Sequence, residues 1–396
     1  MRKVWLSVNF ILGITAAAAA VDFGLIMDME PEYVSGADGE TFTFTADYIP
    51  WFSASIGEKT GFYVSTRFMF EDTYKDRLVK DFSFEFERME LNIRPRKTVY
   101  LSLGRQRYRD GGGMIAAGNF DGFSGTFGLG RARLGGGVFF TGFLYKKTAE
   151  ILMTSLDWEN YMDSGMYFAS RRMIITAEGE FSDLSSRTSL AVSALAQFDL
   201  NEYGPSALHS QYLEARLGIE AANTLRFTIT GLGAVAESGR ETRIGLAAAL
   251  AANWEIPGNL MDMLSGELRW GSGAVNNTIG PFLPVSRIAQ GQIFTPTLSG
   301  TMNGRISYTA RPHAAFSTSA AAAVFLRTDL ETLTDRELDN TSKERFLGGE
   351  FYGQFIWAPQ SPLRVTVGGG VFFPWGAFIK DADPRWKFDA GLIFSL

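Results

Sequence analysis

The last residues of the chain alternate between apolar and polar or small side chains. Apolar residues stand at every second position from Trp386 to Leu396, with Lys387, Asp389 and Ser395 between them. A period of two predicts a β-strand with one apolar and one polar face. At the end of a soluble protein such a strand would be an exposed edge that invites aggregation, whereas the last strand of a closed barrel pairs with the first. The pattern therefore favours a closed barrel.

The same kind of segment recurs along the chain, separated by breaks rich in glycine, proline or charge. Strands are expected near residues 22–33, 41–56, 59–70, 81–94, 97–108, 119–129, 131–144, 171–182, 187–199, 209–221, 223–236, 241–254, 263–272, 299–310, 314–328, 345–357, 362–373 and 385–396. This count of eighteen is even, which places both chain ends on the periplasmic side of a bacterial barrel. We therefore predict an all-β fold, a transmembrane antiparallel up-and-down β-barrel of eighteen strands, with sixteen as the alternative.

The connections between these strands alternate in length. Tight turns follow the even-numbered strands, and longer stretches follow most odd-numbered strands, with residues 237–240 as an exception. Short periplasmic turns and long external loops are typical of outer-membrane barrels, and a β-sandwich would not show this rhythm. The longest external loops are expected near residues 145–170, 273–298 and 329–344.

One predicted strand changes the parity of its apolar residues. The phenylalanines from Phe82 to Phe86 occupy even positions, whereas the apolar residues from Met89 to Ile93 occupy odd positions. A β-bulge near Glu87 would keep both sets on the lipid-facing side.

The N-terminus has the pattern of a secretory signal peptide. Arg2 and Lys3 precede a short apolar run, and Ala18 to Ala20 form a small-residue cleavage site before Val21. The alternative, an N-terminal anchor helix, would need a longer apolar run to span a bilayer. We expect residues 1–20 to be the signal peptide and residues 21–396 to form a single barrel.

Composition narrows the class further. The chain has 33 phenylalanines, 43 glycines and no cysteine, and its net charge is −6. Its mean hydropathy is near zero, as expected when half of each strand faces lipid and half faces water. No segment after the N-terminus is apolar for the roughly 18 residues that a transmembrane helix needs. The absence of cysteine excludes disulfides and thiolate metal sites, and the negative charge argues against nucleic-acid binding.

The C-terminal residues resemble a known assembly signal. Gly391, Phe394 and Leu396 have the spacing of the C-terminal signal that the outer-membrane assembly machinery recognises, although the usual last residue is phenylalanine. The resemblance implies localisation in the cell outer membrane, with the lipid bilayer and this machinery as partners.

Many arginines fall at positions expected to point into the barrel. They are Arg67, Arg131, Arg133, Arg172, Arg187, Arg216, Arg226, Arg243, Arg269, Arg305, Arg327 and Arg364, whereas the inward acids are fewer, chiefly Glu178, Glu180, Glu214, Glu220, Glu267, Glu350 and Asp389. Arginines along a wet channel attract anions. The alternative is that they form salt bridges that only brace the barrel wall.

One local stretch has a family resemblance. Residues 101–110 and 119–123 (LSLGRQRYRD and NFDGF) resemble a strand–loop–strand motif of alginate-export barrels and related eighteen-strand porins. The resemblance implies that Arg105, Gln106, Arg107, Arg109 and Asp121 line the pore. From the residues alone, Arg105 and Arg107 share the parity of Leu101 and Leu103. They reach the lumen only if the ladder slips near Gly104.

The glycine-rich loop inside this motif departs from the family pattern because residues 111–118 have little polar content. We interpret it as a flexible external loop. The alternative is a loop that folds inward and narrows the pore.

Catalytic chemistry has little support in the sequence. His209 and His313 are the only histidines. His209 has Ser206 and Ser210 near it in sequence but no obvious inward carboxylate, and His313 falls in a predicted periplasmic turn, a poor place for substrate access. The acidic run from Asp329 to Asp339 lacks the spacing of a calcium-binding loop, and we interpret it as a solvated external loop. We expect no enzyme activity, no metal and no cofactor.

The sequence predicts a porin that passes small hydrophilic solutes across the outer membrane with a mild anion preference. The alternative is an adhesin or receptor that acts through its external loops. A lipid transporter is less favoured because the predicted interior is rich in arginine. The oligomeric state stays open, a homo-oligomer included.

Overall fold

The computed structural model describes residues 20–36, 39–201, 207–239, 241–276, 278–333, 335, 337–360 and 362–396. The predicted signal peptide therefore lies almost wholly outside the described residues. No helix in the described part of the chain is long and apolar enough to cross a membrane.

Eighteen strands and two short helices make up the described structure. The elements are β1 (Ala20–Gly36), β2 (Gly39–Ile56), β3 (Thr60–Tyr74), β4 (Leu78–Arg96), β5 (Val99–Arg109), β6 (Ala117–Leu129), β7 (Ala132–Phe140), α2 (Lys146–Ala149), α3 (Ser155–Met162), β8 (Arg172–Ser185), β9 (Thr188–Asp199), β10 (Leu208–Ala222), β11 (Leu225–Ser238), β12 (Glu241–Glu255), β13 (Met263–Gly271), β14 (Thr301–His313), β15 (Phe316–Arg327), β16 (Phe346–Gln360), β17 (Leu363–Pro374) and β18 (Arg385–Ser395). Each of the eighteen strands coincides, within a few residues, with a strand expected from the sequence, whereas the two helices were not expected.

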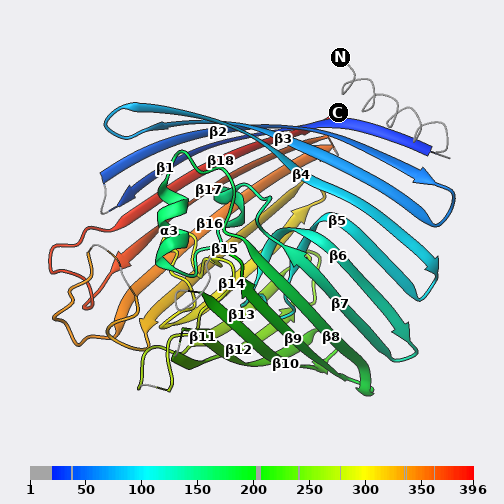
Figure 1. The fold of residues 1–396 in the computed structure, drawn as a ribbon. Helices are drawn as coiled ribbons and strands as arrows, with labels where there is room; N and C mark the ends of the chain where they lie inside the picture. Colours follow the sequence, from blue (N-terminus) through cyan, green and yellow to red (C-terminus); the bar gives the residue numbers. More distant parts are fainter. Residues whose placement is uncertain are drawn as a thin grey trace.

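The sheet closes on itself. Each strand pairs antiparallel with its neighbours in sequence, and β1 pairs with β18, so that the first and last strands lie side by side (Figure 1). The backbone of Leu396 is tied to Leu25 by two hydrogen bonds, of 2.9 and 3.2 Å. Closure confirms the predicted barrel and decides for eighteen strands over sixteen.

The outer surface of the barrel is apolar. Phe123 pairs with Val138 and Phe127 with Leu134 across β6 and β7, and all four side chains are exposed. Large apolar side chains remain exposed in this number only where lipid covers them. The predicted bulge is also confirmed, because Ser65 pairs with Arg88 while Thr66 pairs with Phe86.

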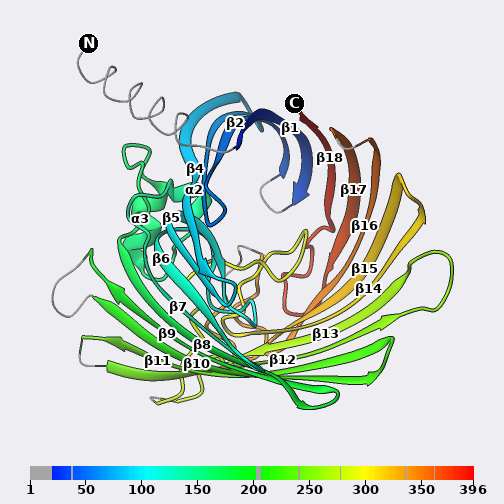
Figure 2. The same ribbon diagram turned by 90° about the vertical axis from the view of Figure 1, so that its right-hand side faces the viewer.

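The wall is interrupted between β4 and β5. Their ladder runs only between the Arg96–Val99 pair and the Met89–Arg105 pair, so the outer half of β4 pairs with β3 alone. At this level Gly104 has a φ of +114°, and a Cβ on it would lie 2.0 Å from the Met89 carbonyl oxygen. Only glycine tolerates this conformation and this close approach. The β5–β6 hairpin bends here and its tip lies inside the barrel (Figure 2).

Residues 141–171, which contain α2 and α3, lie beside the outer half of β4. The Tyr145 amide donates to Glu85 at 3.1 Å, and Lys147 forms an ion pair with Asp81 at 2.6 Å. Helix α3 begins with a capping box at Thr154, which satisfies amides that would otherwise lack partners. This connection therefore covers the place that β5 leaves open.

Four further connections, those after β5, β13, β15 and β17, fold into the barrel and form its apolar core. One cluster joins the loop after β5 to residues 144–169 and to the loop after β13, and it includes Ile115, Phe120, Ile174 and Phe282. A second cluster joins residues 293–294, Leu333, Leu338 and residues 377–382 to the inner faces of β15 to β17. In Figure 2 the yellow connection after β13 crosses the interior. The interpretation of residues 111–118 as a flexible external loop is wrong, because apolar side chains in this loop pack against the inner wall.

Candidate channel interior

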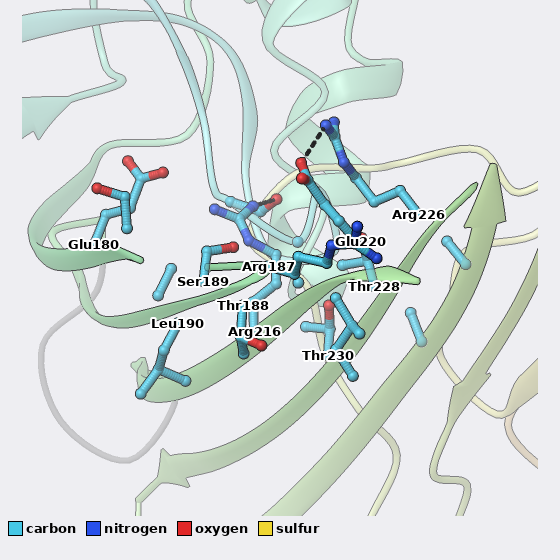
Figure 3. Close-up of a pocket in the computed structure, with 18 of the residues that line it drawn as sticks. Glu180, Arg187, Thr188, Ser189, Leu190, Arg216, Glu220, Arg226, Thr228 and Thr230 are labelled. Carbon is cyan, nitrogen blue, oxygen red and sulfur yellow. Dashed lines mark hydrogen bonds and ion pairs between the residues drawn. The ribbon is translucent and has the colours of Figure 1, made fainter. Parts of the chain in front are cut away.

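The space left between the inward loops and the wall contains a cavity of about 600 Å³. It lies between the loop after β5 and the tight turns that follow β8 and β10, and β8 to β13 form its wall (Figure 3). Its lining is mostly polar or small, with Ser189, Thr228 and Thr230 among the wall residues. A cavity of this size and lining would hold water and a small solute.

Charges of both signs line this cavity. The arginines are Arg187, Arg216 and Arg226, and the acids are Glu180, Glu220 and Glu267. Arg226 and Glu220 form an ion pair of 2.8 Å, which Figure 3 shows as a dashed line. The formal charges of the cavity therefore balance.

Two of the predicted pore-lining arginines hold the constricting loop in place. The Arg216 guanidinium donates to the Gly111 carbonyl oxygen. The Arg269 guanidinium donates to the Gly113 carbonyl oxygen at 3.4 Å and to the Glu267 carboxylate at 2.9 Å. Both side chains therefore lie in the interior and also hold the loop after β5 by hydrogen bonds.

A second cavity of about 290 Å³ lies across the barrel, against β1 and β16 to β18. Lys387 forms an ion pair of 2.7 Å with Glu32, and the Tyr352 hydroxyl donates to Asp389 at 2.6 Å. Arg364, a predicted pore-lining residue, is exposed and belongs to this lining. The interior thus has polar, charged walls on both sides of the inward loops.

Several other predicted arginines form ion pairs along the wall. The pairs are Arg67 with Asp47 and Glu87, Arg133 with Glu180, and Arg243 with Glu241. Arg131 lies in the turn between β6 and β7, and Arg305 lies on β14 beside Glu267 of β13. These ion pairs agree with the alternative that the arginines brace the barrel wall. The paired side chains are also partly exposed to solvent, so a solute in the interior could contact them.

Arg172 does not line the channel. Its side chain is 0% exposed and forms ion pairs with Asp157 of α3 and with Asp199. Its Nη2 atom lies 2.8 and 2.6 Å from the two Asp157 carboxylate oxygens. Arg172 has the inward orientation expected from its position in the strand, but the sequence did not show that α3 would cover it.

Arg105 is also buried in the wall, not in the lumen. The β5–β6 register is continuous through Gly104, so the ladder slip that would turn Arg105 inward does not occur. The guanidinium donates to the Phe86 and Phe143 carbonyl oxygens, at 2.5 and 2.8 Å, and to both oxygens of Asp121. It therefore bonds to the edge of β4 that β5 leaves unpaired.

The other motif residues differ in their positions. Gln106 points inward and is buried, where it donates to the Gly122 carbonyl oxygen and accepts from the Ser124 hydroxyl. Arg107 and Arg109 share the face of the hairpin that carries the buried arginine and are exposed. The motif that carries the resemblance therefore lies where the β5–β6 hairpin leaves the wall. Of the residues expected to line the pore, Gln106 points inward, whereas Arg105, Arg107 and Arg109 lie on the opposite face.

Sequence reasoning missed the carboxylates that fix the inward loops. Asp110 accepts hydrogen bonds of 2.7 to 2.9 Å from the amides of Met114, Ile115 and Ala116. Glu350 accepts from three consecutive amides in the loop after β13, those of residues 292–294, at 2.8 to 3.0 Å. An acid directly before a glycine-rich loop was the available signal for the first site; the second depends on residues far apart in sequence.

His209 has a structural contact at the end of β10. Its Nδ1 atom accepts from the Asp199 amide at 3.2 Å, and its ring packs on Phe198. Among the described residues, no group of three or more histidine, aspartate or glutamate side chains is placed to hold a metal ion.

Comparison with known proteins identifies the fold. No family model matches the chain, and no curated protein matches its sequence. Among solved structures, OccK2 (OpdF) of Pseudomonas aeruginosa, crystallised with glucuronate, is similar with a TM-score of 0.63 and 10% identity, covering 96% of this chain and 98% of that one. OprD of the same organism has a TM-score of 0.61 and 12% identity, with coverages of 96% and 95%. OccK3 (OpdO) has a TM-score of 0.61 and 9% identity, with 98% of both chains covered.

At such low identity, the likeness establishes a shared fold, that of the outer membrane protein OprD. A closed antiparallel barrel with an apolar outer surface pairs its backbone groups between strands, as surrounding lipid requires. The chain is accordingly a multi-pass β-barrel of the outer membrane.

Proposed function

We propose that this protein is a channel that lets small hydrophilic solutes cross the outer membrane. The observation that carries the proposal is the interior: cavities of about 600 and 290 Å³ with polar, charged linings lie inside a closed barrel and beside loops that narrow it. A barrel of about sixteen or more strands is too wide for wall side chains alone to fill. The inward loops would then set the size limit, and the polar walls would replace part of the hydration of the solute.

We further propose a mild preference for anions. Arg364 is exposed in the second cavity, and Arg216 borders the first beside the constricting loop. The glucuronate bound to OccK2, a sugar carboxylate, is compatible with such a preference. Because acids balance the arginines in the larger cavity, the preference would be weak. Passage of alginate itself is a narrower prediction that rests only on the motif in residues 101–123.

Planar-bilayer recordings test both parts of the proposal. The wild-type protein should conduct, and its reversal potential in a salt gradient should give a higher permeability for the anion. Changing Arg131 and Arg133 to glutamate reverses four units of charge at the periplasmic mouth and should lower the anion preference. Screening over about 8 Å at physiological salt means that the shift should be large at low salt and small at high salt.

A double variant of Lys59 and Lys97 to glutamate is the matched control, because both residues are exposed on periplasmic turns and the total charge change is the same. A change in reversal potential that occurs in the Arg131 and Arg133 double variant but not in the control variant supports the proposed anion preference. Equal selectivity in all three proteins at every salt concentration contradicts it, and a wild type that inserts without conducting contradicts the channel.

The adhesin or receptor alternative depends on loops that are displayed to the outside. Residues 145–170, 273–298 and 329–344 instead contribute buried side chains to the two interior clusters, among them Ile151, Phe282 and Leu338. This arrangement favours the channel. Conduction measurements decide between the two, because a surface receptor needs no open path.

A further inference from the structure

A pocket of about 360 Å³ lies on the outside of the barrel, near the external ends of β12 to β15. Its floor consists of Leu246, Trp270, Met302 and Leu326. Across the ladder Trp270 pairs with Met302, and Met302 with Leu326, so these side chains share one face. It is the face that also carries the exposed Leu250, Leu268 and Val324. The floor is therefore a continuation of the lipid-facing surface.

A ledge formed by the chain after β13 overhangs this floor. Beyond Gly271 the chain leaves the strand, and residues 278–280 return to bond with Ile244 of β12, at 2.8 and 3.0 Å. Between these points Val275 is 68% exposed although it is apolar. Val275 and Ile279 form the outer lip of the pocket.

Two arginines close the external end of the pocket. Arg345 is exposed and donates to the Thr328 carbonyl oxygen. Arg327 is buried, and its guanidinium donates to the Glu344 carbonyl oxygen at 2.8 Å and to the Ser342 carbonyl oxygen. Among the residues that the structure describes, the lining contains arginine but no aspartate or glutamate, and the Asp329 carboxylate lies behind it against Gly273. The pocket thus combines an apolar floor, a membrane-facing opening and positive charge at its outer end.

We propose that this pocket binds a phosphorylated, acylated glycolipid of the outer leaflet. One acyl chain lies on the floor below the ledge, and a phosphate group binds the Arg345 guanidinium. Arginine matches phosphate because its donors form a planar fork that can bond two oxygens at once. The volume falls within the range of about 300–1,000 Å³ that is usual for ligand pockets. A basic site beside transmembrane segments is a known arrangement for recognising lipid headgroups. This assignment does not depend on whether the barrel conducts.

Native mass spectrometry of the full-length protein in detergent tests the assignment, with diphosphorylated lipid A as the probe. Three probes are compared at equal concentration: lipid A, its dephosphorylated form, and phosphatidylglycerol. We expect discrete adducts of lipid A and few of the others. Changing Arg345 to glutamine keeps a donor for the Thr328 carbonyl but removes the charge, and should weaken binding by about tenfold or more, as expected for a lost charge-assisted hydrogen bond.

A second variant acts on the acyl chain. Leu246→Trp places a bulkier apolar group on the floor and should reduce binding while the arginines remain intact. Lys380→Ala, which removes an exposed external cation away from the pocket, is the control and should bind as the wild type does. Heat-modifiable mobility on gels verifies that each variant is a closed barrel.

Several results would overturn the assignment. Binding of lipid A that is equal in all closed variants places the glycolipid elsewhere on the barrel. Equal adducts with the dephosphorylated form remove the role of the phosphate. A preference for phosphatidylglycerol makes the ligand an anionic phospholipid instead of a glycolipid.

Discussion

At the scale of single residues, the clearest feature is an arginine that substitutes for backbone pairing. Arg105 bonds to the edge of β4 through the Phe86 carbonyl oxygen and to the covering segment through the Phe143 carbonyl oxygen. Its charge is balanced by Asp121 and Glu85, both within 3.4 Å. Such a buried group is costly to desolvate, but removing one member of the cluster leaves the others uncompensated.

We therefore expect Arg105→Ala to destabilise the barrel by about 3–5 kcal/mol, the usual effect of breaking a buried ion pair. The measurement is the temperature at which the folded, fast-migrating form is lost on gels. Arg107→Ala is the control, because Arg107 lies on the same strand and is exposed; its effect should be small. Equal unfolding temperatures for the two variants would show that the cluster does not hold the wall.

The environment of Asp329 leads us to expect that the stability of the loops it joins depends on pH. Burial raises the pKa of this carboxyl, but hydrogen bonds from the Thr332 hydroxyl and from the amides of Thr332, Glu331 and Ala274 outweigh burial and lower it. Because the folded-state pKa lies below the unfolded value, the ionised carboxylate stabilises the loops at neutral pH, and this contribution is lost as the pH falls through the folded-state pKa.

Hydrogen exchange at the amides of Ala274, Glu331 and Thr332 should therefore become faster at about pH 3 than at neutral pH, after correction for intrinsic rates. In Asp329→Asn these amides should be weakly protected at both pH values. Asp163→Asn, in the connection that holds α3, should keep the wild-type dependence. Protection that is independent of pH in the wild type would contradict the assignment.

At the scale of elements, the inward bend of the β5–β6 hairpin organises the interior. The hairpin leaves the wall at Gly104, which opposes Gly122 on β6. A Cβ on Gly122 would lie 2.1 Å from the Val138 carbonyl oxygen. Two glycines at one level let the hairpin bend, and residues 141–171 then cover its outer face. The polar residues on that face are explained by this bend, since they do not meet lipid.

Gly104→Ala should weaken the bend. The positive φ costs about 1–3 kcal/mol for a residue with a side chain, and the close approach to the Met89 carbonyl adds to this strain. We expect a lower unfolding temperature and a higher single-channel conductance, because the loop would be less firmly held in the interior. Gly231→Ala is the matched control, since a Cβ there has no atom within 4 Å. Identical behaviour of both variants would contradict the hinge.

At the scale of the whole molecule, the barrel depends on closure between β1 and β18. Phe394 pairs with Met27 on one side and with Leu363 on the other. The C-terminal residues are thus part of the seam that joins the ends of the sheet. Recognition of Gly391, Phe394 and Leu396 by the assembly machinery stays a prediction.

Deleting residues 393–396 should prevent closure, since it removes the rungs that link β18 to the start of β1. Edge backbone groups left in lipid cost several kcal/mol each, so the truncated chain should be degraded in cells and lack heat-modifiable mobility. Ser395→Ala, which keeps the backbone rungs, should assemble normally. Normal abundance and insertion of the truncated protein would refute this role of the C-terminus.

The sequence by itself predicted the barrel, the positions of its strands and the bulge near Glu87, whereas the choice of eighteen strands over sixteen came from the closed sheet. These features follow from the alternation of side chains and from the breaks between strands, which are local properties of the chain. Local parity also identified most inward arginines, such as Arg216 and Arg269.

Only the tertiary structure decided how the interior is filled. The inward loops are held by contacts between residues far apart in sequence, such as Glu350 with the amides of residues 292–294. The alternation of side chains along a strand shows which face of the sheet a residue occupies, but it does not show which segment of the chain covers that face. Arg172 points inward and is buried under α3, whereas Arg105 points outward and is buried under the segment that replaces β5 in the wall. Both outcomes depend on where a distant connection packs, and this is set by the closed barrel as a whole.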